Sequence, residues 1–183
     1  MDLAAARVAA VAAVRLACGV TEAVRAELAG ADRQTKSDRS PVTVADFAAQ
    51  AILIAVLSRA FPDVPVVAEE SAAGLRGEEG RCVRERVVGF VRSCAPTAHM
   101  SDEQVLDAID AGSAEPPSGS RDGPRFFWCI DPIDGTVSNF NPQNHVGRGW
   151  GIRNGAMGAV RLPKILVLTI GGSSVGMQRA SRG

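Results

Sequence analysis

Apolar residues recur at helical spacing in two long stretches near the start of the chain. Residues 3–28 carry one continuous face that predicts an amphipathic helix. Its members are Val11, Val14, Cys18, Thr21, Val24 and Leu28. Residues 44–60 are apolar on more than one side, which predicts a largely buried helix. Thr43, followed three positions later by Asp46, matches a capping pattern at a helix start, so capping is the local interpretation of Asp46.

Two shorter apolar runs, residues 64–68 and 126–130, have the length and composition of buried strands. The first run ends at Glu69, Glu70 and Ser71, and the second ends at Asp131. Adjacent glutamates after a strand are often only a hydrated loop. In open α/β sheets, however, ligands bind beyond the carboxyl ends of the strands. We therefore expect Glu69 and Asp131 to converge on one cation.

The remaining elements alternate with polar connections. Residues 81–94 predict a helix with Val83, Val87 and Val91 on one side. Ser101 and Gln104 have the spacing of a capping box that starts a short helix. Residues 31–42, 72–80 and 114–124 are interpreted as loops. The order of helices and strands predicts an α/β fold.

The stretch from Trp128 to Thr136 (WCIDPIDGT) combines a strand with a turn that carries acidic side chains. Asp131 and Asp134 stand three positions apart, and Pro132 between them prevents the strand from continuing. Gly135 permits a backbone conformation that other residues resist. Two carboxylates on a stiff turn suit a hard cation such as Mg²⁺. A plain surface turn is the alternative, but the full nine-residue string favours a site.

Composition and charge describe a globular chain whose two parts differ. The chain has 183 residues, 46% of them apolar, which is enough for one domain with a core. Residues 1–136 hold 14 basic and all 20 acidic residues, whereas residues 137–183 hold six basic and no acidic residues. We therefore divide the chain into an N-terminal part, residues 1–136, and an atypical, irregular basic tail, residues 137–183.

The four cysteines and two histidines do not have the spacing of a zinc site. Scattered thiols in a chain that matches a secretory signal poorly favour a reducing, cytoplasmic location, with an organellar address left open. By this pattern no apolar run is long enough to span a membrane, so no membrane partner is expected.

Three separated blocks of the sequence together resemble the inositol monophosphatase superfamily of Mg²⁺-dependent, lithium-sensitive phosphatases. The blocks are Ser40–Asp46 (SPVTVAD), Val67–Ser71 (VAEES) and Trp128–Thr136. The match over Lys36–Gln50 is most similar to the 3′(2′),5′-bisphosphate nucleotidase branch, whose members convert 3′-phosphoadenosine 5′-phosphate to AMP and phosphate. The resemblance implies part of a layered αβαβα fold and a small phosphorylated substrate, with inositol monophosphate as the alternative.

The same resemblance implies a role for each matching residue. Glu69, Asp131 and Asp134, with the Ile133 carbonyl, would bind Mg²⁺, and Glu70 would lie just behind them. Asp46 and Thr136 would orient and deprotonate the attacking water. Gly135 and Thr136 would present main-chain donors to the phosphate.

The chain departs from the family pattern after Thr136. Members of the family continue with a second αβ half that supplies one more aspartate ligand, and residues 137–183 contain no acid to replace it. We interpret the tail as the product of an alternative splice, a retained intron or a shifted reading frame. The alternatives are a catalytically inactive relative and a basic tail that binds a polyanion, although its six dispersed charges make nucleic acid an unfavoured partner.

Overall fold

Helices make up most of the chain that the computed structural model describes, which comprises residues 1–30, 41–114, 126–133, 149–153, 156–160 and 166–171. Side chains are described for residues 1–27, 43–114 and 126–133. The helices are α1 (Leu3–Gly30), α2 (Pro41–Ala60), α3 (Ala73–Arg76), α4 (Arg81–Arg92) and α5 (Asp102–Asp110), with 3₁₀ turns η1 (Glu78–Gly80) and η2 (Ala95–Thr97). The strands are β1 (Val66–Ala68), β2 (Phe126–Asp131), β3 (Gly149–Arg153), β4 (Ala156–Val160) and β5 (Leu166–Gly171).

The two long N-terminal helices are found where the hydrophobic pattern predicts them, but α2 begins earlier than expected. Pro41 is its first residue. Proline fits there because the first turn of a helix needs no main-chain donor and the ring presets a helical φ. Thr43 consequently lies inside the helix, and Asp46 lies beyond its first turn. The interpretation of Thr43 and Asp46 as a capping pattern is therefore wrong.

The helices of the middle segment are also confirmed. Val83, Val87 and Val91 of α4 are buried on one face. Ser101 caps α5 through a capping box, in which its hydroxyl accepts from the Gln104 N–H at 3.2 Å and the Gln104 side chain accepts from the Ser101 N–H at 2.8 Å. The prediction of a loop over residues 72–80 is wrong, because this segment forms α3 and η1.

A three-stranded sheet with the order β1-β2-β5 contains both predicted strands. Strand β1 runs parallel to β2, with Val66 opposite Trp128 and Ala68 opposite Ile130. Strand β5, which lies in the predicted tail, runs antiparallel to β2 on its other side. Strands β3 and β4, also in that tail, form a separate antiparallel pair. The tail, predicted to be irregular, thus contains three strands among its described residues.

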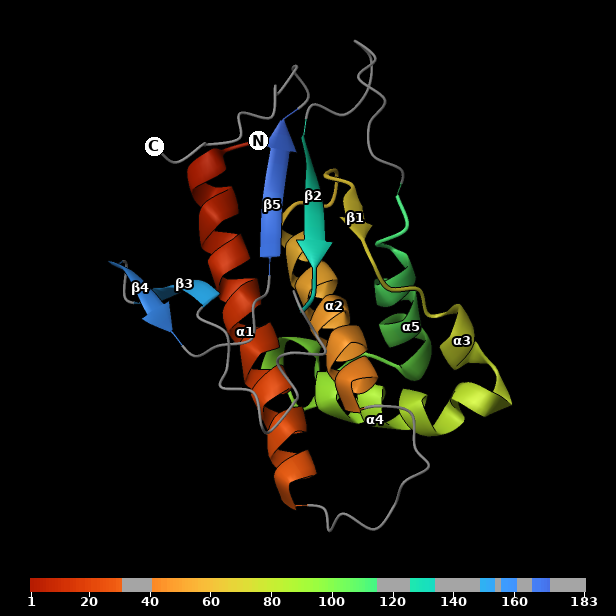
Figure 1. Cartoon of the computed structure of the whole chain (residues 1–183). Coiled ribbons are helices and arrows are strands. Elements are labelled where there is room, and N and C mark those ends of the chain that lie inside the picture. Colours follow the sequence, from red (N-terminus) through yellow and green to blue (C-terminus); the bar gives the residue numbers. More distant parts are fainter. Residues whose placement is uncertain (31–40, 115–125, 134–148, 154–155, 161–165, 172–183) are drawn as a thin grey trace, which may run out of the picture.

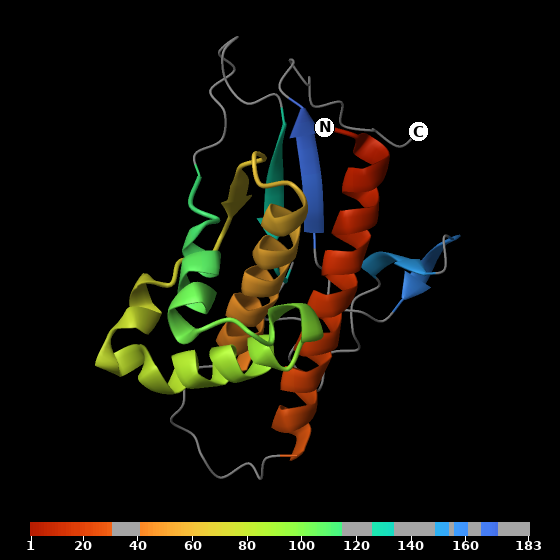
Figure 2. The ribbon, with the colours of Figure 1, turned by 180° about the vertical axis from the view of Figure 1, so that it is seen from behind.

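Helices α1 and α2 lie side by side and pack against one face of the sheet (Figures 1 and 2). Side chains alternate along a strand, so Trp128 and Ile130 of β2 point to the same face. Both are buried, in one cluster with Ala13, Ala17, Ala49, Leu53, Leu57 and Val66. The small alanines of α1 and α2 allow close contact between the helices. Helix α4 crosses the lower end of α2, and α5 flanks α2 (Figure 1).

Helices α1 and α2 are both long and apolar enough to cross a membrane, by length and composition alone, over Leu3–Glu27 and Thr43–Ala60. This finding differs from the sequence expectation that no apolar run has the required length. The α2 span is 67% buried, as in the core helix of a globular domain, whereas the α1 span is 28% buried and lies near the N-terminus. Burial of α2 within the fold accounts for its apolar composition.

Candidate metal and phosphate site

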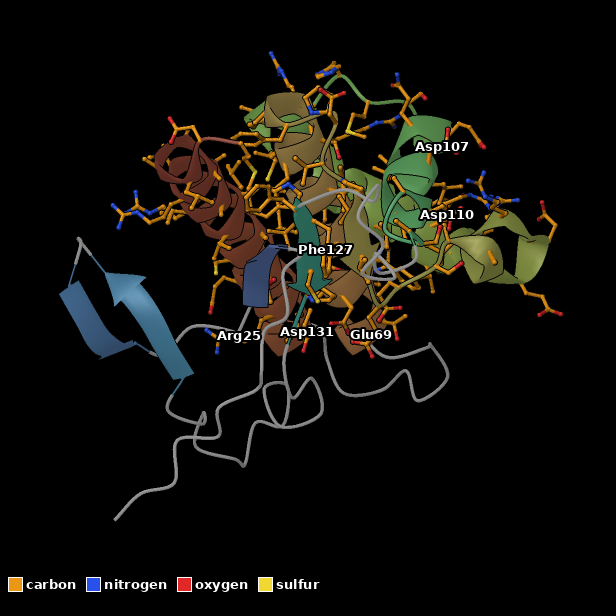
Figure 3. The ribbon with its side chains drawn as sticks, turned by 90° about the horizontal axis from the view of Figure 1, so that it is seen from above. Arg25, Glu69, Asp107, Asp110, Phe127 and Asp131 are labelled. Atoms are coloured by element: carbon orange, nitrogen blue, oxygen red, sulfur yellow. The ribbon has the colours of Figure 1, made fainter. Side chains whose placement is uncertain are left out.

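The parallel pairing of β1 and β2 brings two acidic residues to one edge of the sheet. Ala68, the last residue of β1, pairs with Ile130 of β2. Glu69 follows β1 directly, and Asp131 is the last residue of β2. Neighbouring strands lie about 4.8 Å apart, so the two carboxylates start from adjacent positions. Figure 3 shows Glu69 and Asp131 next to one another. Glu69 is exposed and Asp131 is partly exposed. The strand pairing brings these two positions together, and their binding of one cation stays a prediction.

The two residues that follow Asp131 turn the chain back into the protein. Pro132 and Ile133 are both buried, and the Ile133 side chain belongs to the core cluster around α2, α4 and α5. Because an isoleucine side chain has no oxygen, nitrogen or sulfur atom, Ile133 could act as a ligand only through its main chain. The family resemblance assigns it that role, through its carbonyl oxygen.

Asp46 lies on α2, with only 7% of its surface exposed. Its burial is unusual for an aspartate, since charged side chains are rarely buried without compensating interactions. Gln50 follows one helical turn later and therefore lies on the same face of α2. This face is the one that contacts the turn after β1, as the hydrogen bonds of Gln50 show.

The main chain of Glu70 is held by Gln50, whose side chain is fully buried. The Gln50 Nε2 group donates to the Glu70 carbonyl at 2.7 Å, and the Glu70 N–H donates to Gln50 Oε1 at 2.9 Å. Nε2 also donates to the Ile109 carbonyl at 3.0 Å. The side-chain amide thus pairs with Glu70 as a neighbouring strand would, and it fixes the backbone immediately after Glu69.

Asp110, at the end of α5, holds the next part of the same turn. Its carboxylate accepts a hydrogen bond from the Ala72 N–H at 2.7 Å. Arg76 binds the same carboxylate at 2.9 Å, and it also pairs with Glu103 and, at 2.8 Å, with Asp107. The turn from Glu69 to Ala72 is consequently tied to α2 at one point and to α5 at another.

Burial raises the pKa of the Glu70 carboxyl, and the negative charge of Glu69 raises it further. Both effects disfavour a second negative charge at this edge of the sheet. A cation bound beside Glu69 and Glu70 would act in the opposite direction on the pKa of Glu70, because a nearby positive charge favours the ionised carboxylate.

Other predicted site residues cannot be placed. Asp134, Gly135 and Thr136 lie outside the described residues, so the predicted set is placed only for Asp46, Glu69, Asp131 and Ile133. Across the described part of the chain, no three His, Cys, Asp or Glu side chains form a group that could hold a metal ion. The predicted ligands that can be placed would all offer oxygen atoms, which are the donors that Mg²⁺ prefers.

Sequence reasoning missed Gln50 and Asp110. Gln50 stands within the run AAQAILIAVL of a helix that is otherwise buried and apolar, and such an isolated polar position signals a side chain with buried partners. Asp110 gave no comparable signal, because acidic residues near the end of an exposed helix are common.

Comparison with known proteins agrees with this arrangement. A sequence model of the inositol monophosphatase family matches residues 2–145, which is more than half of the chain. The chain belongs to the inositol monophosphatase family. The family resemblance inferred from the three sequence blocks is thus confirmed, and the α/β fold with its small parallel strand pair is consistent with it.

Within the family, the chain is similar to 3′(2′),5′-bisphosphate nucleotidases. It is 40% identical over 137 residues to one of Schizosaccharomyces pombe, a match that covers 69% of this chain and 37% of that protein. It is 41% identical over 103 residues to a putative mitochondrial one of Arabidopsis thaliana, covering 55% of this chain and 25% of that protein. It is also 33% identical over 161 residues to one of Emericella nidulans, a match that covers 80% of this chain and 44% of that protein. The chain therefore matches less than half the length of each of these relatives.

Proposed function

We propose that this chain binds Mg²⁺ at the edge of the β1-β2 pair and hydrolyses a phosphate monoester, with 3′-phosphoadenosine 5′-phosphate as the preferred substrate. The observation that carries the proposal is the juxtaposition of Glu69 and Asp131 after paired parallel strands. The names of the similar proteins support the choice of a bisphosphate nucleotide.

The residues of this edge suit the chemistry of phosphate transfer. A bound magnesium ion would neutralise phosphate charge and lower the pKa of a coordinated water. Glu69, Asp131 and the Ile133 carbonyl would hold the ion, and Asp134 would complete the set. Asp46 on α2, together with Thr136, would orient the attacking water and accept its proton, a task that a buried carboxylate with a fixed position performs well.

The substrate would be held by Gly135 and Thr136 through their main-chain donors. Hydrogen bonds from N–H groups to phosphate oxygens are strong because the acceptor is charged. These two residues lie outside the described part of the chain, so their role rests on the family pattern alone. Inositol 1-phosphate is the alternative substrate within the same chemistry.

Phosphate release in the presence of Mg²⁺ tests the proposal. The assay compares 3′-phosphoadenosine 5′-phosphate with inositol 1-phosphate, using the wild type, Asp46→Asn and Asp134→Asn, with the exposed Asp63→Asn as the matched control. We expect release from the nucleotide and a loss of roughly 10²-fold or more in both site variants. Asp63→Asn should retain full activity.

Each other outcome has a defined meaning. Equal release by the wild type and both site variants would contradict the proposed function. Release from the inositol ester alone would transfer the proposal to that substrate. Binding of Mg²⁺ without any release would favour the catalytically inactive alternative.

A further inference from the structure

We infer that Gln50 is a positioning residue, which ties the turn carrying Glu69 and Glu70 to helix α2 and thereby fixes Glu69 relative to Asp46. The inference deepens the proposed function and rests on it. It begins from the three hydrogen bonds of the Gln50 side chain, two to Glu70 and one to Ile109, which join elements that are 20 and 59 positions from it along the chain.

The orientation of the Gln50 amide is dictated by its partners. Its Nε2 group faces two carbonyl oxygens and its Oε1 atom faces an N–H group, so a reversed amide would place like groups together. Both Nε2 hydrogens are used. Since the Gln50 side chain is fully buried, its amide depends on these protein partners for its hydrogen bonds.

The backbone of Glu69 is therefore fixed on both sides. Before it, the Ala68 N–H donates to the Gly112 carbonyl at 2.7 Å. After it, both main-chain groups of Glu70 are bound by Gln50. The Glu69 side chain is exposed, so its own packing does not set its position, and the fixed backbone determines where its carboxylate starts.

Gln50 and Asp46 lie one turn apart on the rigid helix α2, so Gln50 also fixes the Glu69–Glu70 segment relative to Asp46. The two residues are four positions apart on α2, so they share a face of a helix that is buried from Val44 to Ile54. A shift of the turn away from α2 would change the separation between Asp46 and Glu69. Misplacements of about 1 Å at a catalytic site can cost about 10²-fold in rate, so this link matters for function.

Gly112 packs closely against the end of β1 and against Gln50. A Cβ atom built on Gly112 would lie 2.6 Å from Ala68 Cβ and 3.2 Å from Gln50 Nε2. The Gln50 amide, the end of β1 and the segment that follows α5 thus lie close together. This packing supports a role for Gln50 in fixing position, beyond filling space in the core.

The test variant is Gln50→Met, which keeps the volume of the side chain and removes all three hydrogen bonds. Thr97→Val is the matched control, because Thr97 is also buried and donates to the Val91 carbonyl at 2.6 Å, in η2, which supplies none of the proposed site residues. Two quantities are measured on the full chain, the Kd for Mn²⁺ by electron paramagnetic resonance and the hydrogen exchange rate of the Glu70 amide. Urea unfolding shows that each variant is folded.

For Gln50→Met we expect Mn²⁺ binding to weaken by about 10- to 100-fold, as when residues that orient metal ligands are lost. The Glu70 amide should exchange at least roughly tenfold faster, because its hydrogen bond is gone. Thr97→Val should change neither quantity, even if it is destabilised equally. A folded Gln50→Met protein with wild-type Mn²⁺ affinity and wild-type exchange would overturn the inference.

Two further outcomes remain decisive. If Gln50→Met does not fold, Gln50→Leu takes its place, since it also removes the two donated hydrogen bonds and the acceptor of the Glu70 N–H; it should show the same two losses. If the wild type binds no Mn²⁺, the proposed function fails on that result. The exchange rate of the Glu70 amide then decides the inference, with faster exchange in the variant supporting it and unchanged exchange refuting it.

Discussion

Arg76 of α3 binds the carboxylate of Asp110 at the end of α5, with 2.9 Å between Nη2 and Oδ2. The same carboxylate accepts the Ala72 N–H and so holds the turn after β1. Burial by itself raises the pKa of Asp110, but the hydrogen bonds from Arg76 and Ala72 outweigh it, and the pKa is lowered overall. The ion pair therefore contributes to stability only while Asp110 is ionised.

The stability conferred by Asp110 should depend on pH. A lowered pKa in the folded state means that its contribution is present above about pH 4, where the unfolded residue is already ionised. It is lost as the pH falls through the folded pKa. We expect Asp110→Asn to lower the free energy of unfolding by about 1 kcal/mol at pH 7, and by progressively less below pH 4. Urea unfolding at a series of pH values from 7 downward measures the free energy of unfolding of each variant, with Asp63→Asn as the control. A difference between the wild type and Asp110→Asn that does not change with pH would refute the explanation.

Gly112 and Gly89 should respond to alanine in opposite directions. The Cβ of Gly112→Ala would lie 2.6 Å from Ala68 Cβ and 3.0 Å from Ile54 Cδ1, and such overpacking costs about 1–3 kcal/mol. Gly89 lies in the middle of α4 with no atom within 4 Å of the new Cβ. Gly89→Ala should stabilise the protein by about 0.5–1 kcal/mol through helix propensity. Thermal unfolding measures both changes, and a Gly112→Ala protein as stable as the wild type would contradict the packing described around β1.

The thiols should differ in reactivity. Cys82 is exposed, whereas Cys18 of α1 is buried and its pKa is raised by burial and, secondarily, by the charge of Glu22. Both effects reduce the thiolate that reacts with disulfide reagents. We expect Cys82 to be modified first and Cys18 only when α1 opens, as followed by mass spectrometry of the labelled peptides. Equal labelling rates at the two cysteines would show that α1 does not pack as described.

The sequence predicted the parts of the structure that depend on local pattern. The faces of α1, α2 and α4 follow from helical spacing, and the acidic strand ends follow from two short apolar runs. The start of α2 was misplaced because Thr43 and Asp46 imitate a capping pattern, whereas Pro41 can occupy the first turn. Gln50 could not be assigned, because its partners are main-chain groups at Glu70 and Ile109, and sequence periodicity carries no information about such distant contacts.

Direct binding of Mn²⁺, which shares the oxygen ligands of Mg²⁺, tests most directly whether Glu69 and Asp131 hold one ion together. The titration compares the wild type with Glu69→Gln, Asp131→Asn and the double variant, with the exposed Glu79→Gln as control. Each single substitution should weaken binding by about tenfold or more, and the two effects should be non-additive because the residues share one ion. Wild-type affinity in both single variants, or losses no greater than that of Glu79→Gln, would contradict a shared site at the ends of β1 and β2.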